Sequence, residues 1–176
     1  MDNVLEYFIK NPEKEFHIRE LAKLTRRSPT TISKYLKNFE KQNLLKSRKK
    51  FKHILFKANT DSLSFKDLKI YTNINNLRRS GLIEYLIDEF NHPETIVLFG
   101  SYRKGEDIQI SDIDILTITT LKKKIDLEKF EKFLNRKIQL FLYSNNEIDK
   151  MKTNNKELLN NMINGIVLYG FWEVFK

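Results

Sequence analysis

Apolar residues in the first part of the chain recur at intervals of three or four, which predicts three short amphipathic helices. These helices cover residues 2–10, 19–25 and 29 to about 42, with Asp2 expected to cap the first. Ser28-Pro29 is typical of a helix start, because serine caps the first turn and proline lacks the N–H that would stay unpaired there. The buried side chains that the pattern predicts in the second and third helices are Leu21, Ala22, Leu24, Ile32, Leu36 and Phe39.

Extended segments lie before the second helix, at residues 16–18, and after the third. Leu44-Leu45 begins a strand, residues 47–51 predict a basic turn, and residues 53–57 return as a second strand. The order of helix, helix, turn, helix and basic hairpin resembles the winged helix-turn-helix family of DNA-binding proteins in its organisation. That resemblance implies that residues 1–60 bind double-stranded DNA.

Residues 59–62 are polar and mark a domain boundary, after which helical and extended patterns alternate. Residues 65–79 predict a linker helix, with Leu68, Tyr71, Ile74 and Leu77 at helical spacing, that can dock on either domain or on a second subunit. The elements predicted after it are a helix at 81–90, strands at 96–99 and 113–118, a helix at 126–135, a strand at 137–143, helical residues 147–165 and a closing strand at 166–170. The apolar residues expected to be buried by the helix at 126–135 are Leu127, Phe130, Phe133 and Leu134.

The distribution of charge along the sequence also separates a first domain from a second. The net charge of +9 lies entirely within residues 1–60, because the remaining residues balance. A strongly basic first domain beside a neutral second one favours a polyanionic partner for the first. The chain has no cysteine, which favours a reducing cytoplasm, and no apolar run of transmembrane length, so we expect no membrane association.

The third helix would present its outer face to the major groove, and the hairpin would contact phosphates or the minor groove. The alternative is a basic packing module with a solvated face. The residues predicted to contact DNA are Thr30, Thr31, Ser33, Lys34 and Lys37 on the helix, with Pro29 beside them, and Arg48, Lys49, Lys50 and Lys52 on the hairpin.

The candidate chemistry lies in the second domain, in the segment GSYRKGEDIQISDIDIL that begins at Gly100. It follows the apolar run 96–99, and the Gly-Ser pair allows a turn whose N–H groups can face an anion. Side chains two apart in a strand share a face, so Asp112 and Asp114 are expected to point the same way. Two such carboxylates suit a divalent cation that carries a nucleoside triphosphate.

This spacing resembles the motif of the minimal nucleotidyltransferases, a branch of the polymerase β-like superfamily, over roughly residues 82–171. The resemblance implies triphosphate binding by the Gly-Ser pair, catalysis with Mg²⁺ or Mn²⁺ at the two aspartates, and ATP or another NTP as substrate or ligand. The residues carried over are Gly100, Ser101, Asp112 and Asp114, with Ser111 as a further nucleotide contact. The expected fold class is therefore α+β: a winged helix-turn-helix domain at 1–60, a linker helix at 61–80, and a nucleotidyltransferase-like domain with a mixed sheet flanked by helices at 81–176.

One position departs from that family, which usually has a third aspartate on the strand after the helix. Gln139 has the parity to face the site, but an amide cannot accept a proton from an attacking hydroxyl near neutral pH. Either the domain transfers nucleotides at a reduced rate, with Glu106 or Asp107 as a replacement base, or the fold survives as an inactive nucleotide sensor or dimerisation module.

The sequence therefore leaves two functions open. One is a nucleotidyltransferase that moves NMP to a protein or RNA hydroxyl. Because members of the minimal family act in toxin–antitoxin pairs, the resemblance also implies a small helical partner protein. The other is a DNA-binding transcriptional regulator whose second domain senses nucleotide or forms a homodimer through residues 65–79.

Overall fold

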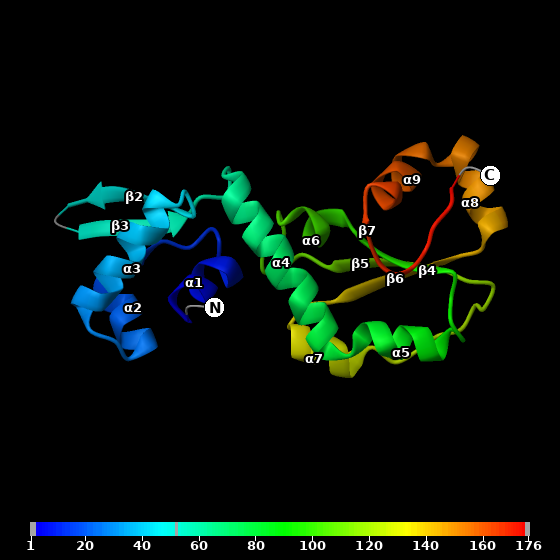
Figure 1. The fold of residues 1–176 in the computed structure, drawn as a ribbon, viewed down its shortest axis with the longest axis horizontal. Coiled ribbons are helices and arrows are strands. Elements are labelled where there is room, and N and C mark those ends of the chain that lie inside the picture. The colour runs from blue at the N-terminus through cyan, green and yellow to red at the C-terminus, as the bar shows by residue number, and fades with distance from the viewer. Residues whose placement is uncertain (1–2, 52, 175–176) are drawn as a thin grey trace. The chain divides into compact units, whose positions relative to one another are not determined.

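The computed structural model describes residues 3–51 and 53–174, so Asp2 and Lys52, two residues with predicted roles, lie outside the described residues. The chain divides into two compact units, Met1–Lys69 and Ile70–Lys176 (Figure 1). Helix α4, Leu63–Ser80, contributes to both. Its Phe65 is fully buried in the core of the first unit, and its Leu77 is fully buried in the core of the second.

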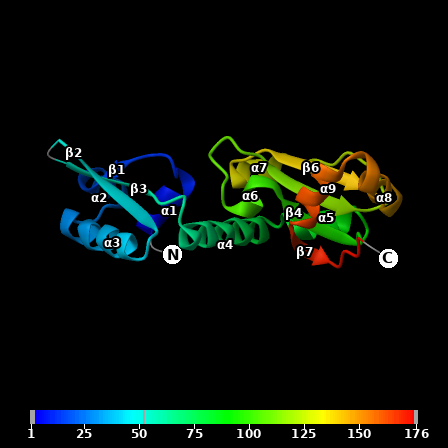
Figure 2. The same cartoon turned by 90° about the horizontal axis from the view of Figure 1, so that it is seen from above.

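The first unit packs three helices against a small antiparallel sheet with the strand order β1-β3-β2 (Figure 2). The helices are α1, Asn3–Lys10; α2, Ile18–Thr25; and α3, Pro29–Lys41. The strands are β1, Phe16–His17; β2, Leu45–Lys50; and β3, His53–Ala58.

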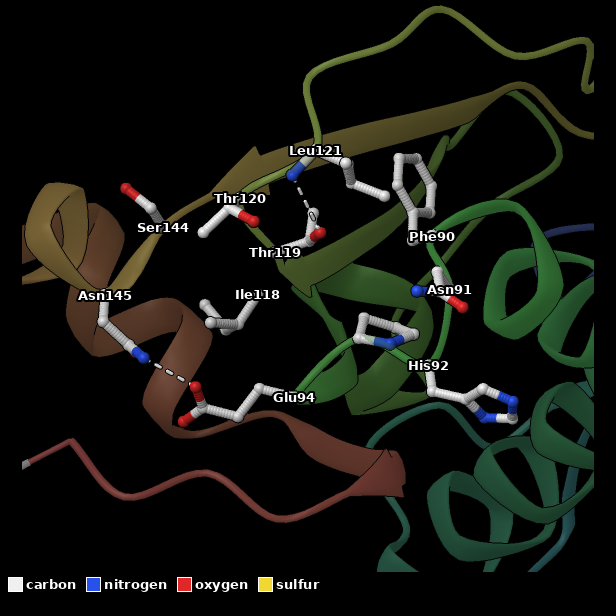
Figure 3. A pocket seen from close by; sticks show the side chains of 11 residues that line it. Phe90, Asn91, His92, Glu94, Ile118, Thr119, Thr120, Leu121, Ser144 and Asn145 are labelled. Atoms are coloured by element: carbon white, nitrogen blue, oxygen red, sulfur yellow. Dashed lines mark hydrogen bonds between the residues drawn. The ribbon is translucent and has the colours of Figure 1, made fainter.

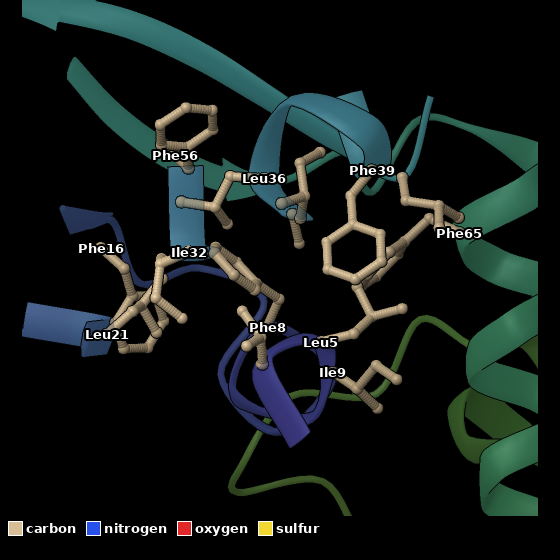
Figure 4. Packing of buried hydrophobic residues seen from close by; sticks show 14 of the residues in the cluster. Leu5, Phe8, Ile9, Phe16, Leu21, Ile32, Leu36, Phe39, Phe56 and Phe65 are labelled. Atoms are coloured by element: carbon tan, nitrogen blue, oxygen red, sulfur yellow. The ribbon is translucent and has the colours of Figure 1, made fainter. Parts of the chain in front are cut away.

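One apolar core holds the helices of this unit together. Phe8 and Phe16 meet edge to face with ring centroids 5.1 Å apart, and Ile32 and Leu36 of α3 are fully buried beside them (Figure 4). At the start of α3, the Ser28 hydroxyl accepts a hydrogen bond from the Thr31 N–H at 3.1 Å. The predicted capping serine and the predicted core face of α3 are therefore confirmed.

Two predictions for the first unit are wrong. Leu24 is 46% exposed, because the short helix α2 buries only a narrow stripe and Leu24 lies beside it. The basic residues Arg48, Lys49 and Lys50 belong to strand β2 rather than to a turn. Cross-strand pairing continues as far as Lys50 and His53, since backbone hydrogen bonds of a ladder do not require buried side chains. The chain reverses at Phe51.

The second unit is built on a four-stranded sheet with the order β6-β5-β4-β7. Strands β5 and β6 are parallel and the other pairs are antiparallel, so the predicted mixed sheet is confirmed. The strands are β4, Thr95–Phe99; β5, Ile113–Ile118; β6, Ile138–Tyr143; and β7, Ile166–Gly170.

Helices cover both faces of this sheet (Figure 1). Ile113 and Ile115 pack with α5, Leu82–Glu89, α7, Glu128–Leu134, and the end of α4. The alternate residues Leu116 and Ile118 pack with α8, Asn145–Asn154, and α9, Lys156–Ile163. The sheet is therefore buried on both sides, and its strand ends are left for a site.

Phe133 corrects another prediction, because it is 59% exposed on the outer face of α7 while Phe130 fills the core. Helical residues 145–163 form two helices, because Asn155 ends α8 and its side chain caps α9. No helix within the described part of the chain is both long and apolar enough to cross a lipid bilayer.

Candidate active site

Strand β4 leads directly into a short helix, α6, Gly100–Lys104, where a turn was expected. Gly100 has a φ of 71°, a backbone conformation that favours glycine. A Cβ atom at this position would lie 2.0 Å from Asp114 Oδ2. Glycine is therefore required for two reasons. Its backbone adopts a conformation that suits glycine, and a Cβ atom would collide with the Asp114 carboxylate that lies against the Gly100 Cα.

Asp114 is the second residue of β5 and is aligned with Phe99 at the end of β4. Asp112 comes just before the strand, and both side chains are half-buried. Burial, and then the negative charge of Asp112, raise the pKa of Asp114 above its usual value. The two carboxylates therefore repel each other. A bound cation would relieve their repulsion.

Gln139 lies beside these two carboxylates, as its alternating position along the strand predicts. It is aligned with Asp114 in the parallel ladder between β5 and β6. Its Nε2 atom donates a hydrogen bond of 2.8 Å to Asp112 Oδ2. The amide nitrogen must be the atom that faces Asp112, because the amide oxygen would repel the carboxylate. The position of the third acid is thus taken by a neutral donor that fixes Asp112.

A buried ion pair, which sequence reasoning missed, secures the loop between α6 and β5. Asp107 is 2% exposed and accepts hydrogen bonds from Arg136 at 3.2 Å and from Asn73 at 2.9 Å. Arg136 also donates to the carbonyl of Ile108, and Asn73 to the carbonyl of Tyr102. Asp107 is therefore a structural anchor, and its prediction as a replacement base is wrong.

Ser101 lies in helix α6, before this loop, and Ser111 lies near the end of the loop. Ser101 is half-buried in α6, and its carbonyl accepts a hydrogen bond from the Glu106 N–H at 3.1 Å. The Ser111 hydroxyl accepts one from the Ile108 N–H at 3.0 Å, which closes a tight turn just before Asp112. Ser111 thus positions the acidic segment, and its hydroxyl hydrogen is left to donate.

A hollow of about 550 Å³ opens beside Asp112, between the loop, α7 and the start of β6. Acidic and basic side chains both line this hollow, so its charge does not strongly favour the binding of a polyanion. The lining residues are Gln109, Ile110, Ser111, Asp112, Glu128, Glu131, Lys132, Asn135, Arg136 and Lys137. Glu131 fixes one wall, since it accepts hydrogen bonds from Lys137 and from the Ile138 N–H.

A second hollow, of about 320 Å³, lies at the opposite end of the sheet (Figure 3). It is bounded by the end of α5, the end of β5 and the start of α8, and Asn145 donates to Glu94 across one side at 2.6 Å. None of the predicted site residues lines it. The candidate chemistry therefore belongs to the end of the sheet that holds Gly100 and the two aspartates.

The basic surface of the first unit was also predicted from the sequence. On α3, Thr30, Lys34 and Lys37 are exposed, whereas Thr31 and Ser33 are partly covered. On β2, Arg48, Lys49 and Lys50 are all exposed. Arg48 is also held by Glu15, to which its Nε and Nη2 atoms donate hydrogen bonds of 2.5 and 2.7 Å.

Comparison with known proteins places the second unit in a family. The family model described as polymerase beta, nucleotidyltransferase, matches residues 81–171, which is more than half of the chain. The chain therefore belongs to the polymerase β nucleotidyltransferase family. A comparison with curated proteins gave no significant match.

Proposed function

We propose that the second unit transfers a nucleoside monophosphate from an NTP to a hydroxyl group of a protein or RNA. The observation that carries this proposal is the contact between Gly100 and Asp114. It brings the predicted triphosphate-binding turn and the predicted metal-binding acids to one point at the end of β4. Positioning and charge neutralisation are the main contributions that proteins make to such transfers.

The residues present suit one divalent cation. Asp112 and Asp114 offer the hard oxygen ligands that Mg²⁺ and Mn²⁺ prefer, and Mg²⁺ is commonly held by one or two carboxylates together with substrate phosphates. Within residues 3–51 and 53–174, no group of three or more His, Cys, Asp or Glu side chains is arranged to hold a metal. A bound cation would neutralise charge on the triphosphate and on the departing pyrophosphate.

In this proposal Gly100 and Ser101 bind the β- and γ-phosphates, with Ser111 as a further contact, while Gln139 keeps Asp112 in place. The acceptor oxygen bonds to the α-phosphorus as the bridging P–O bond to pyrophosphate breaks. Because residue 139 is an amide, the acceptor proton passes to water. The lack of a base at position 139 lowers the rate by roughly 10²–10⁴.

The test is transfer of radioactive label from α-labelled ATP and other NTPs to the protein, to RNA and to a cell extract. γ-Labelled ATP is the control, because NMP transfer leaves its label in pyrophosphate. We expect α-label only, abolished by Asp112→Asn or Asp114→Asn and increased by Gln139→Asp. Equal labelling by wild type and both asparagine variants would refute the assignment.

The hydrogen bond between Gln139 and Asp112 also favours a second candidate, a domain that binds Mg-NTP without turnover. In that case wild type shows no transfer, whereas nucleotide binding is still lost on Asp112→Asn. Label that appears only with Gln139→Asp would select this candidate over the enzyme. Such a domain would report nucleotide status to the rest of the chain.

For the first unit, we propose a winged helix-turn-helix function in binding duplex DNA. Support comes from the order of its elements, the excess of positive charge and the exposed face of α3 with Thr30, Lys34 and Lys37. Binding should weaken steeply between about 50 and 200 mM salt, because each neutralised phosphate releases counterions. Lys34→Ala with Lys37→Ala should reduce both the affinity and the salt slope. Binding that does not respond to salt would contradict this proposal.

A role in transcription regulation or in a toxin–antitoxin-like system, a small helical partner and a cytoplasmic location all stay predictions. So does a homodimer through residues 65–79. On α4, Phe65 and Leu77 are buried within the chain, whereas Tyr71 is 63% exposed and remains for a second copy. Sedimentation of wild type and Tyr71→Glu tests the dimer, and a monomer at high wild-type concentration would exclude it.

A further inference from the structure

The tip of the β2–β3 hairpin carries an aromatic side chain that folding does not explain. Phe51 is 87% exposed, and its backbone has a φ of 53°. Glycine, asparagine and aspartate adopt this conformation most readily, whereas a bulky residue is uncommon there. Phenylalanine at this position adds neither packing nor a favourable turn to the hairpin.

The stem below the tip is firmly held. Arg48 is fixed by its two hydrogen bonds to Glu15, and Ser47 donates to Glu40 of α3 at 2.5 Å. The ladder between β2 and β3 continues without interruption to the pair Lys50 and His53. Phe51 therefore projects from a hairpin whose stem is held in place by these hydrogen bonds.

The charged residues of the hairpin itself are all basic. Residues 45–58 contain six lysine or arginine residues and no aspartate or glutamate. Lys49 and Lys50 are exposed next to Phe51. A partner that fits this arrangement combines a dense array of negative charge with an apolar slot at its surface. Duplex DNA offers both, since stacked base pairs lie between two rows of phosphates.

We propose that Phe51 is a wedge that inserts between neighbouring base pairs of duplex DNA, while Lys49 and Lys50 bind the flanking phosphates. This inference rests on the proposed DNA binding of the first unit and adds the residue that deforms the duplex. Insertion unstacks a base step and bends the DNA, so it is easiest at flexible pyrimidine–purine steps. An anionic lipid surface also attracts basic and apolar groups, but it gives no role to the hydroxyl-bearing face of α3.

The experiment uses the full chain and duplexes of about 30 base pairs that carry 2-aminopurine beside a central TA step or within an A-tract. Affinity and 2-aminopurine fluorescence are measured for wild type, Phe51→Ala, Phe51→Trp and Lys50→Ala. Phe133→Ala is the matched control, because Phe133 is 59% exposed but lies outside the first unit. Circular dichroism verifies that each variant is folded.

We expect wild type and Phe51→Trp to raise the fluorescence of the TA duplex more than that of the A-tract. Phe51→Ala should remove this rise and weaken binding about 5- to 150-fold, the range seen when a stacking aromatic is truncated. Its salt slope should stay unchanged. Lys50→Ala should keep the fluorescence rise and reduce the salt slope by about 1. Phe133→Ala should match wild type in every measurement.

Three results would overturn the wedge in different ways. Salt-dependent DNA binding with equal affinity for wild type and Phe51→Ala, and no fluorescence rise, refutes the wedge and leaves DNA binding intact. No DNA binding by wild type refutes both. Vesicles of anionic phospholipid are added as a further arm, and Phe51-dependent binding to vesicles without unstacking of DNA would assign the tip to membranes instead.

Discussion

Gly100→Ala tests how closely the two halves of the candidate active site fit together. The φ of 71° at this position costs an alanine about 1–2 kcal/mol. The new Cβ would also lie 2.0 Å from Asp114 Oδ2 and 3.0 Å from its Cγ, so the carboxylate must move by about 1.5 Å to reach an ordinary carbon–oxygen contact. The substitution should therefore destabilise the second unit and also displace a metal-binding acid.

Gly81→Ala separates these two effects. Gly81 has a similar φ of 75°, but no atom lies within 4 Å of the Cβ that alanine would add. We expect Gly81→Ala to lose about 1–2 kcal/mol of unfolding free energy and Gly100→Ala to lose at least as much. Only Gly100→Ala should also weaken Mn²⁺ and nucleotide binding, since only there does the new methyl group collide with Asp114.

The assay combines thermal unfolding with Mn²⁺ titration followed by electron paramagnetic resonance, at temperatures where all variants are folded. For a unit of this size, each 1 kcal/mol corresponds to a shift in Tm of about 4–8 °C. Wild-type Mn²⁺ affinity in Gly100→Ala would refute the proposed contact between the turn and the acid pair. So would an equal loss of affinity in Gly81→Ala.

Three further predictions concern charged groups of the second unit. Asp107→Ala should cost about 3–5 kcal/mol of unfolding free energy, because Arg136 would be left buried and unpaired; a denaturation midpoint close to that of wild type would contradict the anchor role. Asp114→Asn should raise Tm at neutral pH, because the raised pKa of Asp114 means that its ionised form destabilises the fold. This gain in Tm should vanish below about pH 3.8. A gain that persists below that pH would have another origin. Hydrogen bonds from Lys122 and Ser144 lower the pKa of Glu147 to about 2, so Glu147→Gln should reduce Tm above pH 4.5, with the difference from wild type shrinking as the pH falls toward 2.

Local chemistry made much of the first unit predictable. Ser28-Pro29 starts α3 as expected, and the spacing of Ile32, Leu36 and Phe39 gives its buried face. The helical spacing of apolar residues could not show that Leu24 is exposed, because a helix of two turns presents more apolar residues than the small core can cover. The sequence shows that residues 48–50 are basic, but it does not show that Arg48 pairs with Glu15 across a long separation.

In the candidate active site, too, local patterns were predictable and long-range contacts were not. Strand parity predicted that Gln139 would face the acid pair, and the hydrogen bond to Asp112 agrees with it. The anchor formed by Asn73, Asp107 and Arg136 joins three segments that are distant in the chain, so no local pattern points to it. A long-range contact of this kind depends on the finished packing, which single-sequence reasoning cannot supply.

The central claim is that Asp112 and Asp114 hold a divalent cation for a nucleoside triphosphate. The most direct test is Mn²⁺ binding to the full chain, measured by electron paramagnetic resonance with and without a non-hydrolysable ATP analogue. We predict a single bound ion whose affinity rises with the analogue, unchanged stoichiometry in Gln139→Ala, and loss of binding in Asp112→Asn/Asp114→Asn. Binding of Mn²⁺ to the double variant with wild-type affinity would contradict the account.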